Sequence, residues 1–244
     1  MRVAVVSDIH ANRQAFEAVL DDLGGAGTDE VWCLGDLVGY GADPDACVEL
    51  ARGRAKLCLA GNHDLAVTGA LGIEEFSRGA AISARWTRKT IAEDNLAFLR
   101  TLEPAGEEEG IGLYHASPRD PVWEYVLSVR LADRCLDAAD QRVSLIGHSH
   151  IALAFFRAGA GDETIVAPAG AGAFADLSEG EWLINPGSVG QPRDGDPRAA
   201  WLLLDTGERR AEWRRVEYDV AGAAAAIRAA GLPDSLAERL GYGQ

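Results

Sequence analysis

The length, composition and charge of the chain exclude several classes of protein. Its 244 residues are 48% hydrophobic, which is enough for a substantial core and does not fit a disordered chain. No apolar run approaches the roughly 18 residues of a membrane span, and Ser7 and Asp8 end the first apolar run too early for a signal peptide. We therefore expect a soluble cytoplasmic protein without a membrane partner.

The net charge bears on the partners of the chain. With 23 basic and 38 acidic residues the formal charge is −15, and such a surface repels polyanions, so a long nucleic acid is not expected as a partner. A small phosphorylated substrate remains compatible with this charge, because bound metal ions can set the local field of a site. The sequence gives no indication of the oligomeric state.

The first hundred residues alternate between strands and helices. Apolar, β-branched runs predict strands at 2–7, 30–34 and 56–60, and the spacing of Phe16, Val19 and Leu23 predicts a helix over 12–23. This alternation is typical of a sheet built from βαβ units. The amphipathic stretch at 65–103 is expected to form a helical, lid-like insertion.

Beyond residue 103 the pattern changes to strands separated by turns. The acidic run Glu107-Glu108-Glu109 is expected to form a solvated turn. Strands are predicted at 110–114, 142–146, 151–157, 163–168, 181–185, 199–205 and 210–216, and helices at 220–230 and 235–240. Because no linker divides the chain, we expect a single α/β domain over residues 1–244, with two stacked sheets flanked by helices.

All five histidines of the chain follow the ends of predicted strands. His10, His63, His115, His148 and His150 each lie next to Asp, Asn, Gly or another His, whereas core histidines would be scattered within apolar faces. A single histidine in such a place is more often structural than a ligand. Five of them, with none left over, indicate a common site beyond the carboxyl ends of the strands, where open α/β sheets place their ligands.

The side chains at these strand ends suit metal ions. Seven potential ligands are Asp8, His10, Asp36, Asn62, His63, His148 and His150. Mixed Asp, His and Asn ligation favours borderline divalent ions such as Mn, Fe or Zn over Ca or Mg. Seven ligands are too many for one ion that must leave room for a substrate, and they suit two ions that share a carboxylate, as in two-metal phosphatases.

Five short motifs, in their order along the chain, resemble the calcineurin-like metallophosphoesterase superfamily. They are Asp8-x-His10, Gly35-Asp36, Gly61-Asn62-His63-Asp64, His115 and Gly147-His148-Ser149-His150. A later segment is similar to the small bacterial and archaeal phosphoesterase branch: Asn185-Pro186-Gly187-Ser188, followed by Gln191-Pro192-Arg193. The similarity covers nearly the whole chain, and five ordered motifs are far more specific than a single Asp-x-His.

The resemblance implies a fold, a ligand set and a mechanism. The fold is a metallo-dependent phosphatase-like four-layer α/β/β/α sandwich, in which two mixed β-sheets are flanked by helices. One divalent ion would be held by Asp8, His10, Asp36 and His150. A second ion, bridged by the same Asp36, would be held by Asn62, His115 and His148. A hydroxide shared by the two ions would attack the phosphorus of a phosphate ester in line.

The resemblance places His63 beside the metals, where it would protonate the leaving oxygen. Asp64 would orient His63 or, equally well, hydrogen-bond within its own turn. Protein Ser/Thr phosphatases of this superfamily carry Gly-Asp-x-x-Asp-Arg-Gly, whereas this chain reads Gly35-Asp36-Leu37-Val38-Gly39-Tyr40-Gly41. The missing Asp and Arg put in doubt both a phosphatase-type partner for His63 and direct protein phosphatase activity.

Three further residues are candidates for contact with substrate phosphate. Asn12 follows the first ligand pair, although the more favoured role for it is to cap the helix that begins there. Arg119 and Arg193 could clamp a phosphate, but each is more often a surface arginine. The segment 185–188 is expected to form a structural turn behind the metal ligands.

Two functions of different classes fit these motifs. The leading interpretation is an enzyme that hydrolyses a small phosphodiester or nucleotide-like substrate; a dinucleoside polyphosphate and a cyclic nucleotide both remain open, with a phosphomonoesterase or protein phosphatase as alternatives. The other class is a protein-interaction scaffold, since the retromer subunit of this superfamily keeps the fold for protein binding. The intact His63 and the full ligand set favour the enzyme, because a scaffold need not retain them.

Overall fold

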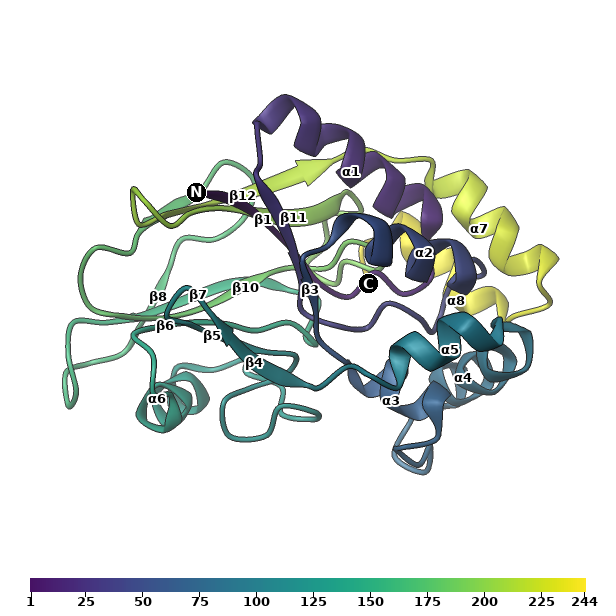
Figure 1. Cartoon of the computed structure of the whole chain (residues 1–244), viewed down its shortest axis with the longest axis horizontal. Coiled ribbons are helices and arrows are strands. Elements are labelled where there is room, and N and C mark those ends of the chain that lie inside the picture. Colours follow the sequence, from purple (N-terminus) through teal and green to yellow (C-terminus); the bar gives the residue numbers. More distant parts are fainter.

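Two six-stranded sheets lie face to face in the computed structural model, which describes residues 1–244 (Figure 1). The first sheet has the order β3 (Leu57–Cys58), β2 (Glu30–Cys33), β1 (Arg2–Val6), β11 (Ala199–Asp205), β12 (Arg210–Val216) and β9 (Phe174–Asp176). The second has the order β4 (Ala105–Glu108), β5 (Ile111–Tyr114), β6 (Val143–Leu145), β10 (Glu181–Pro186), β7 (Ala152–Arg157) and β8 (Ile165–Ala167).

Both sheets are mixed. The neighbours β1, β2 and β3 run parallel in the first sheet, as do β5, β6 and β10 in the second, while all other neighbouring strands pair antiparallel. The carboxyl ends of the parallel strands therefore lie at a shared edge of each sheet, and the loops that follow them carry the candidate site residues.

Helices cover the outer faces and one end of the two sheets (Figure 1). The first sheet is covered by α1 (Arg13–Ala26), α2 (Pro44–Arg54) and α7 (Val220–Ala229), and the second by α6 (Val129–Ala138). The remaining helices are α3 (Asn62–Thr68), α4 (Arg78–Thr90), α5 (Glu93–Leu99), α8 (Asp234–Glu238) and the short 3₁₀ helix η1 (Arg239–Gly241). The expected four-layer α/β/β/α sandwich is confirmed, and no helix has the length and apolar character that a membrane crossing requires.

The alternation of side chains along β1 explains why the layers stack. Val3 and Val5 are buried between the two sheets, whereas Ala4 and Val6 are buried under the helices. Successive residues of a strand point to opposite faces, so a strand covered on both sides is apolar throughout. Trp32 and Trp213 fill the space between the sheets, and burial of each large apolar side chain stabilises the fold by roughly 1.5–3 kcal/mol.

The acidic run at 107–109 differs from its expectation. Glu107 and Glu108 belong to β4, which pairs antiparallel with β5, and only Glu109 lies in the turn. The prediction of a solvated turn is therefore wrong for two of its three residues. β4 is an edge strand with one side open to water, and charged side chains are well tolerated there.

Besides β4, the elements α6 and β9 were not expected from the sequence. The apolar positions of α6, Ala132, Cys135 and Leu136, are spaced as on one helix face, but charged residues between them obscure the pattern. β9 has only three residues, which follow a glycine- and alanine-rich loop. The helical stretch predicted at 65–103 consists of three separate helices, because the backbone is non-helical around 69–77 and 91–92.

Candidate metal centre and active site

Five residues of the predicted site adopt a left-handed backbone. The φ angles are 55° for Asp8, 50° for His10, 54° for Asp36, 63° for His148 and 60° for His150. This region costs a residue with a side chain about 1 kcal/mol or more. Main-chain hydrogen bonds between the loops hold the conformation, among them one from the amide of Asp8 to the carbonyl of Gly35 and one from His10 to Asp36.

The loops bring the acidic and imidazole side chains into two groups that could hold metal ions. In each group the ligand atoms lie within 4.8 Å of one another, and every member is buried. The first group is Asp8, His10, Asp36 and His150, and the second is Asp36, His115 and His148. Asp36 belongs to both, since its Oδ2 lies 3.5 Å from Nε2 of His10 and 3.6 Å from Nε2 of His115.

The tautomers of three histidines follow from their main-chain contacts. Nδ1 of His10 lies 3.1 Å from the carbonyl of Val38, Nδ1 of His115 lies 2.9 Å from that of Leu34, and His150 makes the same kind of contact at 2.7 Å. A carbonyl only accepts hydrogen bonds, so Nδ1 carries the proton in each case. Each Nε2 therefore keeps a lone pair for a metal ion, which is the arrangement that neighbouring carbonyls commonly enforce at metal sites.

Two more side chains complete the second group. Nε2 of His148 is buried without a hydrogen-bond partner, which is unfavourable for a polar atom unless a ligand satisfies it. The Oδ1 atom of Asn62 lies 3.3 Å from Nε2 of His115, and Asn62 is buried at the start of α3. The donor set of nitrogen and oxygen atoms thus fits borderline divalent cations.

Burial controls the protonation of this metal-free cluster. It raises the pKa of Asp8 to about 7 and that of Asp36 well above its ordinary value, and it lowers the pKa values of His10, His148 and His150. The contacts of His10 with Asp36 and of His150 with Asp8 are therefore not ion pairs, because these two imidazoles are neutral. Neutral imidazoles can ligate directly, and a cation would favour the ionised carboxylates that burial alone disfavours.

His63 lies beside the two groups without belonging to either. Its ring centroid is 4.4 Å from that of Tyr40, 4.8 Å from Phe76 and 4.9 Å from His10. Its Nδ1 faces Gly39, where an added Cβ would lie only 2.3 Å away, and Gly39 has a φ of +89°. Burial, and then the charge of Arg193, lower the pKa of His63 to about 3, so the ring is neutral in the free protein.

The carboxylate of Asp64 accepts hydrogen bonds from the backbone. Its donors are the amides of Gly61 (2.9 Å), Val38 (3.1 Å) and Leu37 (3.2 Å). No hydrogen bond joins it to the ring of His63, whose Nδ1 has no partner. Of the two roles expected for Asp64, the observed contacts are those of hydrogen bonding within the turn. Asp64 connects the loop after β2 to the start of α3 through these hydrogen bonds.

The three candidates for phosphate contact have different surroundings. Asn12 caps α1 by accepting from the amide of Ala15 (3.1 Å), and its amide group donates to the carbonyl of Gly190. Arg119 pairs with Glu124 at 2.9 Å and does not line the site cavity. Arg193 does line that cavity. The structure thus brings one of the two predicted arginines to the site.

The turn at 185–188 supports the ligand loops from behind. The side chain of Asn185 donates to the carbonyl of Gly147 at 2.7 Å and to Oγ of Ser149 at 3.0 Å. The hydroxyl of Ser188 donates to the carbonyl of Asp8 at 2.8 Å. These contacts fix the backbone on both sides of the first metal group.

A cavity of about 360 Å³ opens onto the site. Besides the ligands and His63, it is lined by residues that the motifs did not single out: Tyr40, Phe76, Trp123, Tyr125 and Arg239. Tyr40 stands four residues after Asp36 and could have been noticed within that motif. The others come from distant segments, and no local signal in the sequence marks them.

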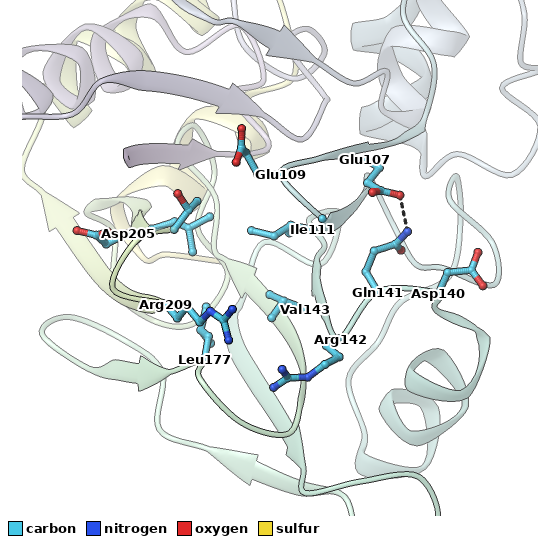
Figure 2. A pocket seen from close by; sticks show the side chains of 13 residues that line it. Glu107, Glu109, Ile111, Asp140, Gln141, Arg142, Val143, Leu177, Asp205 and Arg209 are labelled. Carbon is cyan, nitrogen blue, oxygen red and sulfur yellow. Dashed lines mark hydrogen bonds between the residues drawn. The ribbon is translucent and has the colours of Figure 1, made fainter.

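A second cavity, of about 440 Å³, lies away from the site (Figure 2). It is formed at the starts of β5 and β6 and at the hairpin between β11 and β12, which is the other end of the parallel strands. Glu107 and Gln141 are hydrogen-bonded at its margin (2.6 Å), and Arg209 lies on another side. It contains no histidine and no group of metal ligands, whereas the smaller cavity is lined by members of both groups.

Known proteins resemble the chain over its full length. Residues 1–209 match the model of the calcineurin-like phosphoesterase superfamily domain. An uncharacterized protein of Methanocaldococcus jannaschii is 39% identical over 247 aligned positions, which cover 99% of this chain and 98% of the relative.

Two solved structures have the same architecture. A metallophosphoesterase from Sphaerobacter thermophilus superposes with a TM-score of 0.91 at 39% identity, covering 100% of this chain and 99% of that one. A hypothetical protein from Pyrococcus horikoshii superposes with a TM-score of 0.81 at 18% identity, covering 100% and 98%. The first likeness extends to the sequence, and the second concerns the fold alone.

Proposed function

The chain belongs to the calcineurin-like phosphoesterase superfamily and is a phosphate-ester hydrolase, and we propose that it works with two divalent metal ions on a small phosphodiester or nucleotide-like substrate. The observation that carries this proposal is the shared position of Asp36. A carboxylate that belongs to two ligand groups can bridge two ions, and two-metal sites of this kind serve phosphoryl transfer. Manganese, iron or zinc would suit the donor set.

Each ion would have its own ligands besides Asp36. Asp8, His10 and His150 would hold one ion, and Asn62, His115 and His148 the other. When bound, the ions would neutralise phosphate oxygens and lower the pKa of a water molecule, which supplies the nucleophile. The buried, unpartnered Nε2 of His148 and the lone pairs at Nε2 of the other histidines support this assignment.

His63 is proposed as the general acid. Its Nδ1 is buried against Gly39, which leaves Nε2 as the nitrogen that can reach the cavity. The ring is neutral in the free protein, since its pKa is about 3. The negative charge of a bound phosphate favours the imidazolium form. Substrate binding would therefore favour protonation of His63, and the ring would then donate this proton to the leaving oxygen. Asp64 would act indirectly, by fixing the turn from which His63 projects.

The lining of the cavity supports a small, partly aromatic substrate. Phe76, Trp123 and Tyr125 form a wall next to His63 and His148, with ring centroids 4.8 Å apart for Phe76 and His63 and 4.1 Å apart for Tyr125 and His148. Aromatic side chains offer stacking surfaces to nucleobases. Arg193 would hold the phosphate, because it lines the same cavity and its backbone amide bonds to the carbonyl of His150 at 3.0 Å.

We also propose that the helical segment at 65–103 acts as a lid on a single domain. Phe76, Ser77 and Ala80, around the start of α4, line the cavity, so a movement of α4 would change access to the metals. The C-terminal helices pack against the same region, since Tyr40 and Ala80 share a hydrophobic cluster with Leu236 and Leu240.

We also propose a cytoplasmic location. All four cysteines are free thiols, as is usual for proteins in a reducing compartment.

The proposal is tested by turnover of bis(4-nitrophenyl) phosphate. Protein loaded with Mn²⁺ is expected to hydrolyse this diester, chelator-treated protein is expected to be inactive, and added Mn²⁺ should restore the rate. Arg119→Ala, outside the cavity, should match the wild type, whereas Arg193→Ala should be slower. Metal-independent turnover, or no turnover of any phosphate ester by the loaded protein, would refute the proposed function.

A further inference from the structure

Two arginines from distant parts of the chain lie along one wall of the site cavity. Arg193 belongs to the loop after β10, and Arg239 begins η1 near the C-terminus. Both guanidinium groups lie over the ring of Tyr40, with their carbons 5.6 Å and 6.0 Å from its centroid. Phe76, Trp123 and Tyr125 line the same cavity, and the ring centroids of Phe76 and Trp123 lie 5.4 Å apart.

Neither arginine forms an ion pair with an Asp or Glu side chain. Arg198 and Arg215, close to them in the fold, pair with Asp196 and Asp194, and acidic residues outnumber basic ones by 38 to 23 in the chain. Arg193 and Arg239 nonetheless form no ion pair, although Glu75 lines the same cavity. The absence of an Asp or Glu partner, in a chain with such an excess of acidic residues, points to an anionic partner from outside.

The hydrogen-bonding groups of the two arginines are also incompletely used. Nε of Arg193 is buried without a partner, and one of its amino groups donates to Gln191. Arg239 donates from Nε to the main-chain oxygen of Gln244, and its two amino groups form no hydrogen bond within the protein. Burial and the charge of Arg193 lower the pKa of Arg239. Two like charges near the same ring repel each other, and an anion that contacts both would remove this cost.

We propose, on the basis of the function proposed above, that Arg239 and Arg193 form a second anion subsite for a phosphate beside the one that is hydrolysed. The substrate class is then a nucleotide with at least two phosphates, rather than a simple diester with a single negative charge. Arg193 is the inner member and contacts the hydrolysed phosphate as well, because its main chain bonds to the ligand loop at His150. Arg239 is the outer member and selects for the additional phosphate.

The subsite is a property of the C-terminal segment of this chain. The superfamily model matches residues 1–209, and Arg239 lies beyond them. It reaches the cavity because Leu236, Ala237 and Leu240, on α8 and η1, pack into the cluster around Tyr40. The shared domain would thus supply the hydrolytic chemistry, and the C-terminal helices would supply the preference among phosphorylated substrates.

Binding of two nucleotides to Mn²⁺-loaded protein tests the proposal without requiring turnover. The probes are AMP and α,β-methylene-ADP, a bisphosphate analogue whose bridging bond resists hydrolysis, and their affinities are measured by calorimetry. The wild type should prefer the bisphosphate by about tenfold or more, the usual effect of charge-assisted hydrogen bonds. Arg239→Gln should lose most of this preference and keep its affinity for AMP, and Arg239→Lys should retain part of it. Arg209→Gln, with the same charge change in the distant cavity of Figure 2, should behave like the wild type.

The outcomes separate the subsite from the hydrolytic function. Equal affinity of the wild type for both probes, failure of both to bind, or an unchanged preference in Arg239→Gln would overturn the subsite, whether or not the protein hydrolyses esters. A parallel loss of both affinities with a lower melting temperature would reduce Arg239 to a structural role. A preference that depends on Arg239 in a protein without turnover would retain the subsite and remove the proposed function.

Discussion

The Nε2 atoms of His10 and His150 lie 3.0 Å apart, although both nitrogens carry a lone pair. Each ring donates a hydrogen bond from its single N–H, at Nδ1, to a backbone carbonyl. The acceptor is the carbonyl of Val38 for His10 and that of Gln191 for His150. Two lone pairs at this distance repel each other unless a proton or a cation lies between or beside them. Burial lowers both pKa values, which disfavours the proton and leaves the cation as the better solution.

The first prediction concerns His63 as general acid. His63→Ala should reduce turnover by about 10²–10⁴-fold for esters with alkyl or ribose leaving groups, the usual contribution of such a residue. The loss should be smaller for 4-nitrophenyl esters, because nitrophenolate leaves without protonation. Metal content, determined in parallel, should stay near that of the wild type. Loss of metal would make His63 a ligand, and full activity on poor leaving groups would remove it from the mechanism.

The second prediction concerns the space that Gly39 leaves for His63. Gly39→Ala would place a Cβ 2.3 Å from Nδ1 of His63 in a residue with a φ of +89°, so the ring must move and activity should fall severalfold or more. Gly161→Ala is the matched control, since Gly161 has a φ of +87° with no atom near its Cβ position. Both variants should lose about 1 kcal/mol of stability to backbone strain. Equal activity in the two variants would show that His63 does not need its present position.

The third prediction concerns the pH dependence of the metal-free protein. The carboxyl of Asp8 has a pKa of about 7 in the folded chain, against an ordinary 3.8. Between these values the folded state binds more protons than the unfolded state, so the contribution of Asp8 to stability is lost as the pH rises. The variant Asp8→Asn has no carboxyl to titrate and does not undergo this loss. The free energy of unfolding of the variant minus that of the wild type should therefore increase between pH 4 and pH 8, by on the order of 4 kcal/mol.

Chemical denaturation of chelator-treated protein at several pH values measures this difference. The buried histidines are common to both proteins, so their opposite pH dependence cancels in the comparison. Adding Mn²⁺ at pH 8 should reverse the order, because only the wild type provides the carboxylate that the ion requires. A stability difference that does not change with pH would contradict the burial argument.

The fourth prediction concerns long nucleic acids. Phosphate contacts along a duplex need clustered Lys and Arg, and a chain of charge −15 repels a polyanion. Anisotropy at physiological salt should therefore detect no sub-micromolar affinity for duplex DNA or RNA. Tight duplex binding under these conditions would show that the cationic wall of the cavity serves a polymer rather than a small substrate.

The alternation of strands and helices and the gathering of possible ligands at the strand ends could be predicted because both rest on local signals, whereas the division into two ligand groups came from the family resemblance. Residues such as Asp8, Asp36 and His115 follow apolar strands, and parallel strands bring their carboxyl ends together whatever the detailed packing. The role of Arg239 could not be predicted in this way. It depends on the docking of the C-terminal helices over Tyr40, a contact between segments almost 200 residues apart.

Similar reasons explain the other differences. A carboxylate in a Gly-Asn-His-Asp motif can serve chemistry or a turn, and only the backbone amides around Asp64 distinguish the two. Arg119 and Arg193 look alike in sequence, since each stands near a proline in a loop. The acidic partner Glu124 holds the first away from the site, and the second remains unpaired in the cavity.

Metal stoichiometry in the wild type and in Asp36→Asn tests the two-ion account most directly. Asp36 belongs to both ligand groups, so elemental analysis of metal-replete wild type should give two ions per chain. Asp36→Asn removes a negative charge from both groups and should weaken both ions together, whereas Asp43→Asn, a nearby carboxyl outside these groups, should keep two. One ion in the saturated wild type, or the loss of only one ion in Asp36→Asn, would contradict the bridging role of Asp36.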